Sequence, residues 1–316
     1  MSALVDEDYP RTLAEFATRF ATDAACRGYL AQLRWPTGFV CPQCRSRKSW
    51  RTQRGLQHCA GCGRQTSVTA GTIFQDTRLP LTTWFRAMWY VTGTKTGSSA
   101  MAVQQVLGLG SYQTAWAWLH KLRRAMIRPD RDRLSGQVEV DETLVGGRGG
   151  SRGRGAGKKA LVVVAAEVVG HGIGRIRMRR ISDGSAETLQ AFIDDAIEPG
   201  SDVHTDGWDG YEQVKRRYHH RVSYLRGHHE LASQLLPRVH RVVSLLKRWL
   251  LGTHHGAVSQ VHLDYYLDEF TFRFNRRRSR HRGKLFFRLV QQAVAVDPVP
   301  YQRLIQGERR RSRRHH

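Results

Sequence analysis

Four of the five cysteines stand in two closely spaced pairs. Cys41 and Cys44 frame "CPQC", Cys59 and Cys62 frame "CAGC", and 14 residues separate the two pairs. Disulfides are rare in large cytosolic chains, whereas two C-x2-C pairs at about this spacing supply four thiolates for a tetrahedral zinc ion. The spacing predicts a zinc ribbon in which the metal replaces a core too small to fold alone. The ribbon is either a structural staple or, as its basic neighbours favour, also a DNA contact.

Two aspartates occupy strand positions where a carboxylate needs a partner. Asp141 stands between apolar neighbours that include Val138 and Val140, and Asp206 ends a short strand just before Gly207. A carboxylate in such a place is unfavourable unless it pairs or binds a cation. Two of them on adjacent strands would converge on one divalent metal ion. For Asp206 alone a turn role stays open, because Asp-Gly strongly favours turns.

A helix expected at 237–250, "PRVHRVVSLLKRWL", carries a histidine and a lysine on one face. His240 and Lys247 are seven residues apart, which is two helical turns, so their side chains project within about 20° of each other. On an isolated helix this pattern indicates a partly buried histidine beside a solvated lysine. A shared chemical role needs support from the rest of the chain.

The periodicity around these residues predicts an α/β domain over 136–280. Three strands, "QVEVDETLV", "ALVVVAAEVVG" and "IGRIRMRRI", follow one another as an antiparallel meander. A helix capped by Ser185 comes next, then a strand ending at Asp206, another at 220–226, and helices at 231–251 and 259–275. The order is that of a ribonuclease-H-like mixed sheet flanked by helices. The Gly- and Arg-rich segment 146–159 is expected to be a flexible basic loop.

Helices are predicted on both sides of the zinc ribbon, which we place at 37–75. Residues 1–36 form a helical segment, and 76–130 contain two short helices around the turn Gly108–Gly110. This is helix-turn-helix geometry, with Ser98 and Ser111 as N-caps, although an ordinary helical hairpin would look similar. The residues expected on the outer side of the second helix, and so against DNA, are Lys121, Arg123 and Arg124, with His120 beside them.

The charge balance indicates a polyanionic partner. The 316 residues include 51 Lys and Arg against 27 Asp and Glu, a formal charge of +24, and the pI is near 10.8. Nucleic acid explains this excess better than a membrane. No uncharged apolar run reaches the roughly 18 residues of a spanning helix, and "MSALVDEDYP" has acids where a signal peptide has a basic flank. We expect a cytoplasmic, nucleoid-associated protein without a membrane partner.

Much of the positive charge lies near the C-terminus. From residue 271 onward, 14 Lys and Arg face only Asp297 and Glu308. Arg276, Arg277 and Arg278 are expected to contact DNA phosphates, and 281–316 are expected to form a basic tail. Such contacts add affinity and not sequence choice.

In combination, several motifs resemble one family of bacterial insertion-sequence transposases, the ISXO2-like group, in which a zinc ribbon precedes a DDE-type domain. They are "FVCPQC", "CAGCGRQTSVTAGTIF", "VEVDETLVGG", "HTDGWDGY", "HRVVSLLKRWLLGTHHG" and "YLDEFTFRFNRR", within about 35–280. The resemblance implies a ribonuclease-H-like catalytic core, a pair of Mg²⁺ or Mn²⁺ ions, and cleavage and transfer of double-stranded DNA at transposon ends. It also implies a homo-oligomer on DNA.

The resemblance carries the metal role onto Asp141 and Asp206 and gives the histidine of the 237–250 helix a function. The family's third metal position lies seven residues ahead of a lysine, and His240 stands there, 34 positions after Asp206. A carboxylate is commoner in DDE enzymes, and imidazole shifts preference from magnesium toward manganese. Lys247 would hold a DNA phosphate.

Three alternatives remain open from the sequence. Glu230 could be the third acid, with His240 a spectator. The copy could be inactive. The chain could also be a zinc-ribbon and helix-turn-helix regulator whose strand domain is only a scaffold, and convergence of Asp141, Asp206 and His240 would separate a transposase from it.

Overall fold

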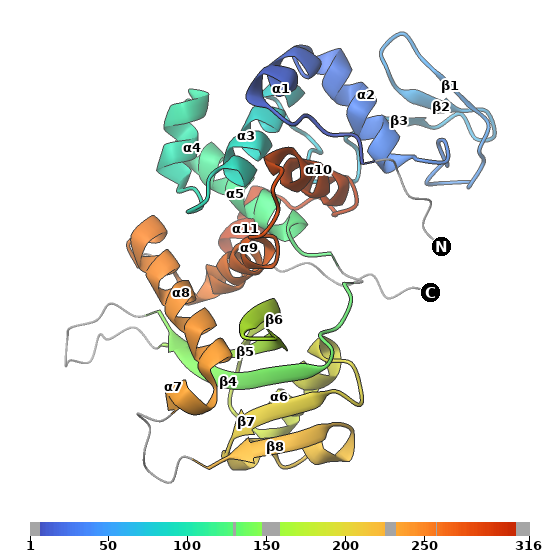
Figure 1. Cartoon of the computed structure of the whole chain (residues 1–316). Helices are drawn as coiled ribbons and strands as arrows, with labels where there is room; N and C mark the ends of the chain where they lie inside the picture. The colour runs from blue at the N-terminus through green and yellow to red at the C-terminus, as the bar shows by residue number, and fades with distance from the viewer. Residues whose placement is uncertain (1–6, 129–130, 147–158, 225–231, 257, 308–316) are drawn as a thin grey trace. The chain divides into compact units, whose positions relative to one another are not determined.

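The computed structural model describes residues 7–128, 131–146, 159–224, 232–256 and 258–307 (Figure 1). The contacts within the chain divide it into two compact units. The first, the helical unit, combines residues 1–128 with 279–316, and the second, the sheet unit, runs from Pro129 to Arg278. The two ends of the chain therefore belong to one compact unit, and the sheet unit is inserted between them in the sequence.

The helical unit contains a small sheet and helices from both ends of the chain. The helices are α1 (Leu13–Arg19), α2 (Asp23–Arg34), α3 (Leu81–Gly93), α4 (Ala100–Leu107), α5 (Tyr112–Ala125), α10 (Arg282–Ala293) and α11 (Tyr301–Ile305). Phe286 on α10 is fully buried, with its ring 5.4 Å from that of Phe16 and 5.6 Å from that of Phe85. These rings come from α1 and α3, so the C-terminal segment completes the aromatic core of the N-terminal helices.

Helices α4 and α5 form the predicted helical hairpin. Ser99, one residue after the expected Ser98, caps α4, and its hydroxyl accepts the N–H of Ala102 at 3.1 Å. Gly108 ends α4 with φ 63°, a left-handed conformation that glycine adopts without a Cβ clash. α5 then starts after Ser111.

The sheet unit is built on five strands in the order β6-β5-β4-β7-β8. They are β4 (Gln137–Val145), β5 (Ala160–Val169), β6 (Gly172–Ile181), β7 (Asp202–Asp206) and β8 (His219–Ser223). β5 is antiparallel to both β4 and β6, whereas β4, β7 and β8 are parallel to one another. A meander followed by two parallel strands on its other side confirms the ribonuclease-H-like mixed sheet.

Helices cover both faces of this sheet (Figure 1). On one face, α8 (Pro237–His254) and α9 (Leu263–Asn275) bury a row of strand residues that includes Val162 and Val164. On the other, α6 (Ala186–Ala196) packs over the alternate row, which includes Val163. Successive residues of β5 therefore face two different apolar cores, which explains why the sequence of this strand is continuously apolar.

Two parts of the chain depart from the sequence expectation. Residues 282–305 form α10 and α11 instead of a tail, because Leu285, Phe286 and Leu289 form a buried apolar face between the basic residues of α10. Between β7 and β8 the chain forms the short 3-10 turns η1 (Asp209–Tyr211) and η2 (Val214–Arg216), and a short α7 (Ala232–Leu235) precedes α8. The rest of the expected tail, and nearly all of the basic loop after β4, lie outside the described residues. Among the helices described, none has the length and apolarity needed to cross a membrane.

Candidate metal centres

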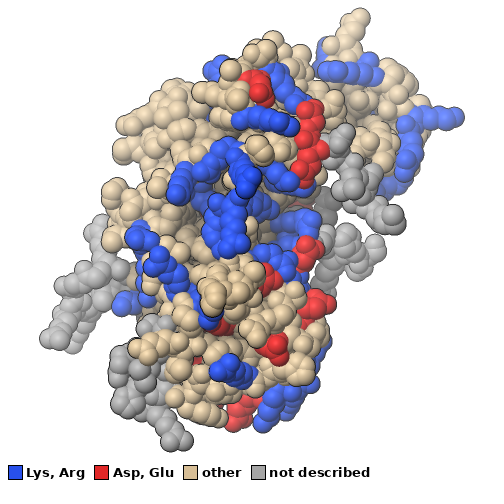
Figure 2. Space-filling model, viewed as in Figure 1, with Lys and Arg blue, Asp and Glu red and all other residues tan. Residues whose placement is uncertain are grey.

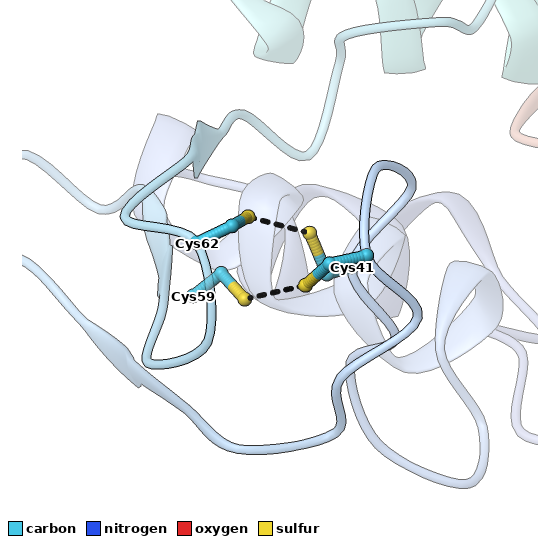
Figure 3. A group of neighbouring side chains, drawn as sticks. Cys41, Cys59 and Cys62 are labelled. Atoms are coloured by element: carbon cyan, nitrogen blue, oxygen red, sulfur yellow. Dashed lines mark hydrogen bonds between the residues drawn. The ribbon is translucent and has the colours of Figure 1, made fainter.

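Two turns of the helical unit bring the four cysteine sulfurs together beside a small antiparallel sheet. This sheet consists of β1 (Ser49–Arg51), β2 (Gln57–Cys59) and β3 (Gln65–Thr66). All four Sγ atoms lie within 4.8 Å of one another. The Sγ of Cys41 is 3.6 Å from that of Cys62, and the second pair is 3.4 Å apart (Figure 3). Sulfurs about 2.3 Å from one tetrahedral zinc ion are roughly 3.8 Å apart, so the cluster fits zinc.

The two cysteine turns share one backbone geometry. The N–H of Arg45 donates to the carbonyl of Cys41 and that of Gly63 to the carbonyl of Cys59, each at 3.0 Å. Both donors have positive φ, 64° and 73°. The pKa of the Cys41 thiol is lowered to about 6, chiefly by the backbone N–H of Cys44. The thiolate that zinc requires is therefore favoured at this position.

In the sheet unit, the parallel strands β4 and β7 place the two predicted aspartates at matching positions. The last registered pair between these strands is Glu139 with His204, and each aspartate lies two residues further along its strand. Residues two apart on a strand point to the same face, so Asp141 and Asp206 share the face covered by α8. Oδ1 of Asp206 accepts the backbone N–H of Trp208 at 3.1 Å.

Helix α8 brings His240 to the first of these carboxylates. Nε2 of His240 lies 3.5 Å from Oδ2 of Asp141, and the side chains are 30% and 15% exposed. Nε2 is itself buried and has no hydrogen-bond partner within the part of the chain that the structure describes. Neighbouring ligands of an octahedral ion at about 2.1 Å are roughly 3 Å apart. An orphaned imidazole nitrogen next to a carboxylate therefore fits a divalent metal ligand set.

The electrostatics of the site favour a bound cation. Burial first and the charge of Asp206 second raise the pKa of Asp141 to about 7, against the opposing effects of the Glu142 N–H and the Lys247 ammonium. Burial and Lys247 lower the pKa of His240, which keeps the imidazole neutral as a ligand must be. A divalent ion would favour the ionised form of both aspartates.

Lys247 stands on the exposed side of α8 and lines a hollow of about 300 Å³. The hollow is also lined by Lys159, at the start of β5, and by the exposed side chains of Leu144 and Leu251. Two ammonium groups beside a carboxylate site suit an incoming phosphate. The sequence analysis missed Lys159, because it falls at the end of a Gly- and Arg-rich stretch in which no single basic residue stands out.

Glu142 is a third carboxylate at this end of β4 that the sequence analysis missed. It follows Asp141 directly, and strand alternation turns its side chain to the opposite face, toward the core under α6. Burial raises its pKa to about 7; Tyr211 opposes the shift, and the charges of Asp141 and Asp206 add to it. Three acids thus interact electrostatically at one edge of the sheet.

Glu139 joins strand β4 to helix α8. Its side chain is 2% exposed, and Oε2 accepts the backbone N–H groups of Arg238 at 2.7 Å and Val239 at 2.9 Å. These are first-turn donors, which have no partner inside a helix. The strand that carries Asp141 therefore holds the first turn of the helix that carries His240. In the sequence, Glu139 is visible only as an acid two positions before Asp141. This spacing does not reveal that its partner is the first turn of α8.

The candidate residues do not all converge to the same degree. Within the described ranges, the four cysteines are the one set of three or more His, Cys, Asp or Glu side chains whose ligand atoms all lie within 4.8 Å. Asp141 and His240 meet, and Asp206 lies beside them at the end of β7. Glu230, the alternative third acid, falls in 225–231 and so outside the described residues.

The predicted DNA contacts on α5 need correction. Arg123 and Arg124 are only 2% and 7% exposed, and α4, α10 and α11 all contact α5. They do not lie on an outer face, and Lys121 is only partly exposed. At the N-terminal end of α5, Tyr112 and Gln113 are exposed instead.

The arginines after α9 differ from one another in their surroundings. The guanidinium of Arg276 lies 4.1 Å from the Phe272 ring, and that of Arg277 lies 4.0 Å from the Phe274 ring. Arg277 also donates to a backbone carbonyl at the start of β6, at 3.2 Å. It therefore ties the end of α9 to the sheet, although Arg277 and Arg278 are both exposed.

Comparison with known proteins places both centres in matched segments. Residues 133–275 match the ISXO2-like transposase domain, and residues 21–65 match the transposase zinc-ribbon domain. A relative from Halobacterium salinarum, described as an uncharacterized protein in transposable element ISH50, is 28% identical over 282 residues. The similarity covers 80% of this chain and 91% of the relative. The matched segments contain the four clustered cysteines, and 133–275 also contains Asp141, Asp206, His240 and Lys247.

Cys41→Ser or Cys59→Ser is expected to release zinc and unfold the ribbon, because the metal replaces a hydrophobic core there. The metal content of the purified protein should fall from about one zinc per chain, while the sheet unit keeps its folding transition. Cys26→Ala, which removes a buried thiol of α2, is the control and should keep its zinc. Equal zinc content in Cys41→Ser and the parent would contradict the assignment.

Glu139→Ala is expected to lower the free energy of unfolding of the sheet unit by about 1–3 kcal/mol and to weaken Mn²⁺ binding, because α8 loses its anchor on β4. Calorimetric titration and chemical denaturation measure the two effects. Glu167→Ala is the matched control, since Glu167 is a buried carboxylate on β5 that binds Arg175 and the N–H of Ser135. Glu167→Ala should destabilise the sheet unit and leave its Mn²⁺ affinity intact. If both variants lost the same Mn²⁺ affinity, a positioning role for Glu139 would be refuted.

Proposed function

This chain belongs to the transposases that join a zinc ribbon to an ISXO2-like domain, and we propose that it binds the ends of an insertion sequence and catalyses metal-dependent cleavage and transfer of DNA strands. The observation that supports this most directly is the 3.5 Å approach of His240 to Asp141, beside Asp206. The matched domains support the transposase class. Strand cleavage and transfer, and the element ends as substrate, are what we propose beyond that class.

Asp141, Asp206 and His240 would hold the divalent ions, which when bound activate the attacking oxygen and stabilise the leaving oxygen of a phosphodiester. The chain's own residues fix the geometry of that reaction. Glu139 keeps α8 on β4, and the buried surroundings of His240 keep its ring neutral. Because imidazole replaces the commoner carboxylate, we infer a preference shifted toward Mn²⁺.

Lys247 and Lys159 would bind and orient the DNA backbone. Both line the hollow at the end of β4, and Lys247 is close enough to influence the pKa values of Asp141 and His240. A phosphate held there would present its neighbouring phosphodiester bond to the carboxylates. Lysine acts at such a site as a point charge, so it supports different DNA sequences equally well.

Binding along the DNA would rest on the wider positive surface. In Figure 2, Lys and Arg side chains outweigh Asp and Glu on the surface in view, with acidic side chains interspersed among them. The zinc ribbon, the exposed start of α5 and Arg278 are the regions we propose for DNA contact. Cutting and joining two element ends requires two active sites, so we also propose a homo-oligomer on DNA.

A DNA-binding regulator is the rival function, and the site geometry argues against it. A scaffold domain has no need of a buried aspartate facing a second aspartate and an orphaned imidazole, because such an arrangement is electrostatically unfavourable. Such an arrangement of carboxylates and imidazole is typical of a site that binds a cation.

Asp141→Asn and Asp206→Asn should each abolish cleavage of DNA carrying the element's own ends while leaving DNA affinity unchanged, because an amide cannot supply the charge that holds a divalent ion. Cleavage assays with Mg²⁺ and Mn²⁺, run beside gel-shift titrations, test this. Asp202→Asn changes an exposed aspartate four residues earlier on β7 and should cut at the parent's rate. A parent that binds its ends and cuts none would favour the regulator or an inactive copy.

His240→Ala should lose most cleavage, whereas His240→Glu restores the commoner carboxylate and should shift the metal preference back toward Mg²⁺. Lys247→Ala leaves the metal ligands in place and removes a phosphate contact, so its loss should be about 1–3 kcal/mol in apparent transition-state binding. Single-turnover rates in each metal measure both effects. Arg248→Ala, at the next exposed position of α8, is the control. Full activity of His240→Ala would make the histidine a spectator.

A further inference from the structure

Two large aromatic side chains stand exposed at the ends of strands β7 and β8. Trp208 follows Asp206 by two residues and is 57% exposed, and Tyr224 directly follows β8 and is 69% exposed. Asp206 pairs with Ser223 in the parallel register of these strands, so both rings emerge at the same edge of the sheet. Exposed apolar surface of this size beside a candidate active site needs an explanation.

A backbone hydrogen bond holds the Trp208 ring, and the Tyr224 ring lies close to the backbone. The indole Nε1 of Trp208 donates to the carbonyl of Gly184 at 3.0 Å, and a Cβ at Gly210 would come within 2.7 Å of this nitrogen. The Tyr224 ring lies against Gly207, where an added Cβ would be 2.6 Å from Cδ1. The glycines on either side of Trp208 therefore let both rings approach the backbone closely. The only polar atom of the indole is already satisfied, so the surface it presents is flat and apolar.

Trp208 is also coupled to the candidate metal site. Its backbone N–H donates to Oδ1 of Asp206 at 3.1 Å. A DNA phosphodiester reacting at Asp141 and Asp206 has a nucleotide attached on each side, and each base lies one sugar away from its phosphate. Residues next to Asp206 are therefore within reach of a base next to the reacting bond.

We propose that Trp208 and Tyr224 form a stacking surface for one unpaired base of the DNA strand being cut. The inference rests on the proposed function for the position of the DNA. The lysines of the hollow at the end of β4 supply charge for phosphates, whereas the two rings beside Asp206 supply a neutral flat surface that matches a base. A base inside a duplex has both faces covered, so the nucleotide must leave the stack to use this surface.

The anchored indole makes this surface effective. An anchored indole loses little conformational freedom when a base stacks on it, so the gain from stacking can offset part of the unpairing energy of the duplex. The unpaired nucleotide would also bend the strand at the point where the carboxylates need access to the phosphodiester. Trp208 would thus be a positioning residue for the proposed reaction.

The test compares paired and pre-opened DNA ends with the full-length chain. On duplexes carrying the element's own end, Trp208→Ala should slow cleavage roughly tenfold to a hundredfold, the range that loss of base stacking predicts. A mismatch at one position next to the scissile bond should restore most of the rate, because the base no longer has to be unpaired. Trp208→Phe keeps an aromatic ring but loses the N–H that anchors it, so its defect should lie between those of the parent and Trp208→Ala. Tyr224→Ala should show a smaller defect than Trp208→Ala.

A binding measurement keeps the test independent of cleavage. Replacing the unpaired nucleotide by an abasic site should weaken binding of the parent and leave the affinity of Trp208→Ala unchanged, because base and ring act as one contact. Val169→Ala, an exposed apolar position at the end of β5, is the control and should respond to the abasic site as the parent does.

The proposal would be overturned if Trp208→Ala and the parent cleaved paired ends at the same rate. It would also be overturned if no mismatch restored the cleavage rate of Trp208→Ala. A change of oligomeric state in Trp208→Ala with unchanged DNA responses would assign the rings to a protein contact and overturn it as well. A parent that cuts no DNA but shows the abasic effect would count against the proposed reaction and support the stacking surface.

Discussion

The buried carboxylate of Glu139 is the contact on which the arrangement of the sheet unit depends. Its Oε2 accepts two backbone N–H groups at the start of α8, with the Arg238 guanidinium 3.4 Å from Oε1. Burial raises the pKa of Glu139, and the N–H groups of the helix and Arg238 oppose that shift. The helix dipole has its positive end at the same place. One strand therefore carries both the residue that fixes the helix and, two positions later, the aspartate that the helix must reach.

This anchor and the parallel pairing of β4 with β7 together bring three segments far apart in the sequence to the candidate site. β4 supplies Asp141, β7 supplies Asp206 in parallel register, and α8 supplies His240 and Lys247 from one face. The raised pKa of Asp141 is the electrostatic consequence of placing two carboxylates side by side in a partly buried position. The zinc cluster is built differently. Its two turns are local, each closed by a backbone bond within the turn, and their sulfurs meet in two pairs at 3.6 and 3.4 Å.

That difference also sets how much the sequence could predict. The zinc ligands follow from spacing alone, because each turn is specified by residues within it, and the sheet order follows from the periodicity of successive strands. Glu139 could not be recognised as an anchor, since its partners are backbone groups a hundred residues away. The burial of Arg123 and Arg124 could not be predicted either, because α5 is contacted not only by neighbouring α4 but also by α10 and α11 from the other end of the chain. In α10 a high density of arginine obscured a buried apolar face.

The insertion of the sheet unit between two parts of the helical unit has a consequence for protein synthesis. The ribosome makes α2, α3 and α5 first, then all of Pro129 to Arg278, and only afterwards α10, whose Phe286 fills the core among the earlier helices. Until then those helices lack one wall of their core and expose apolar surface. The helical unit, whose synthesis begins first, is therefore the last to complete its core. A product that terminates before Arg282 contains the whole sheet unit, but its helical unit lacks the Phe286 ring that packs against Phe85.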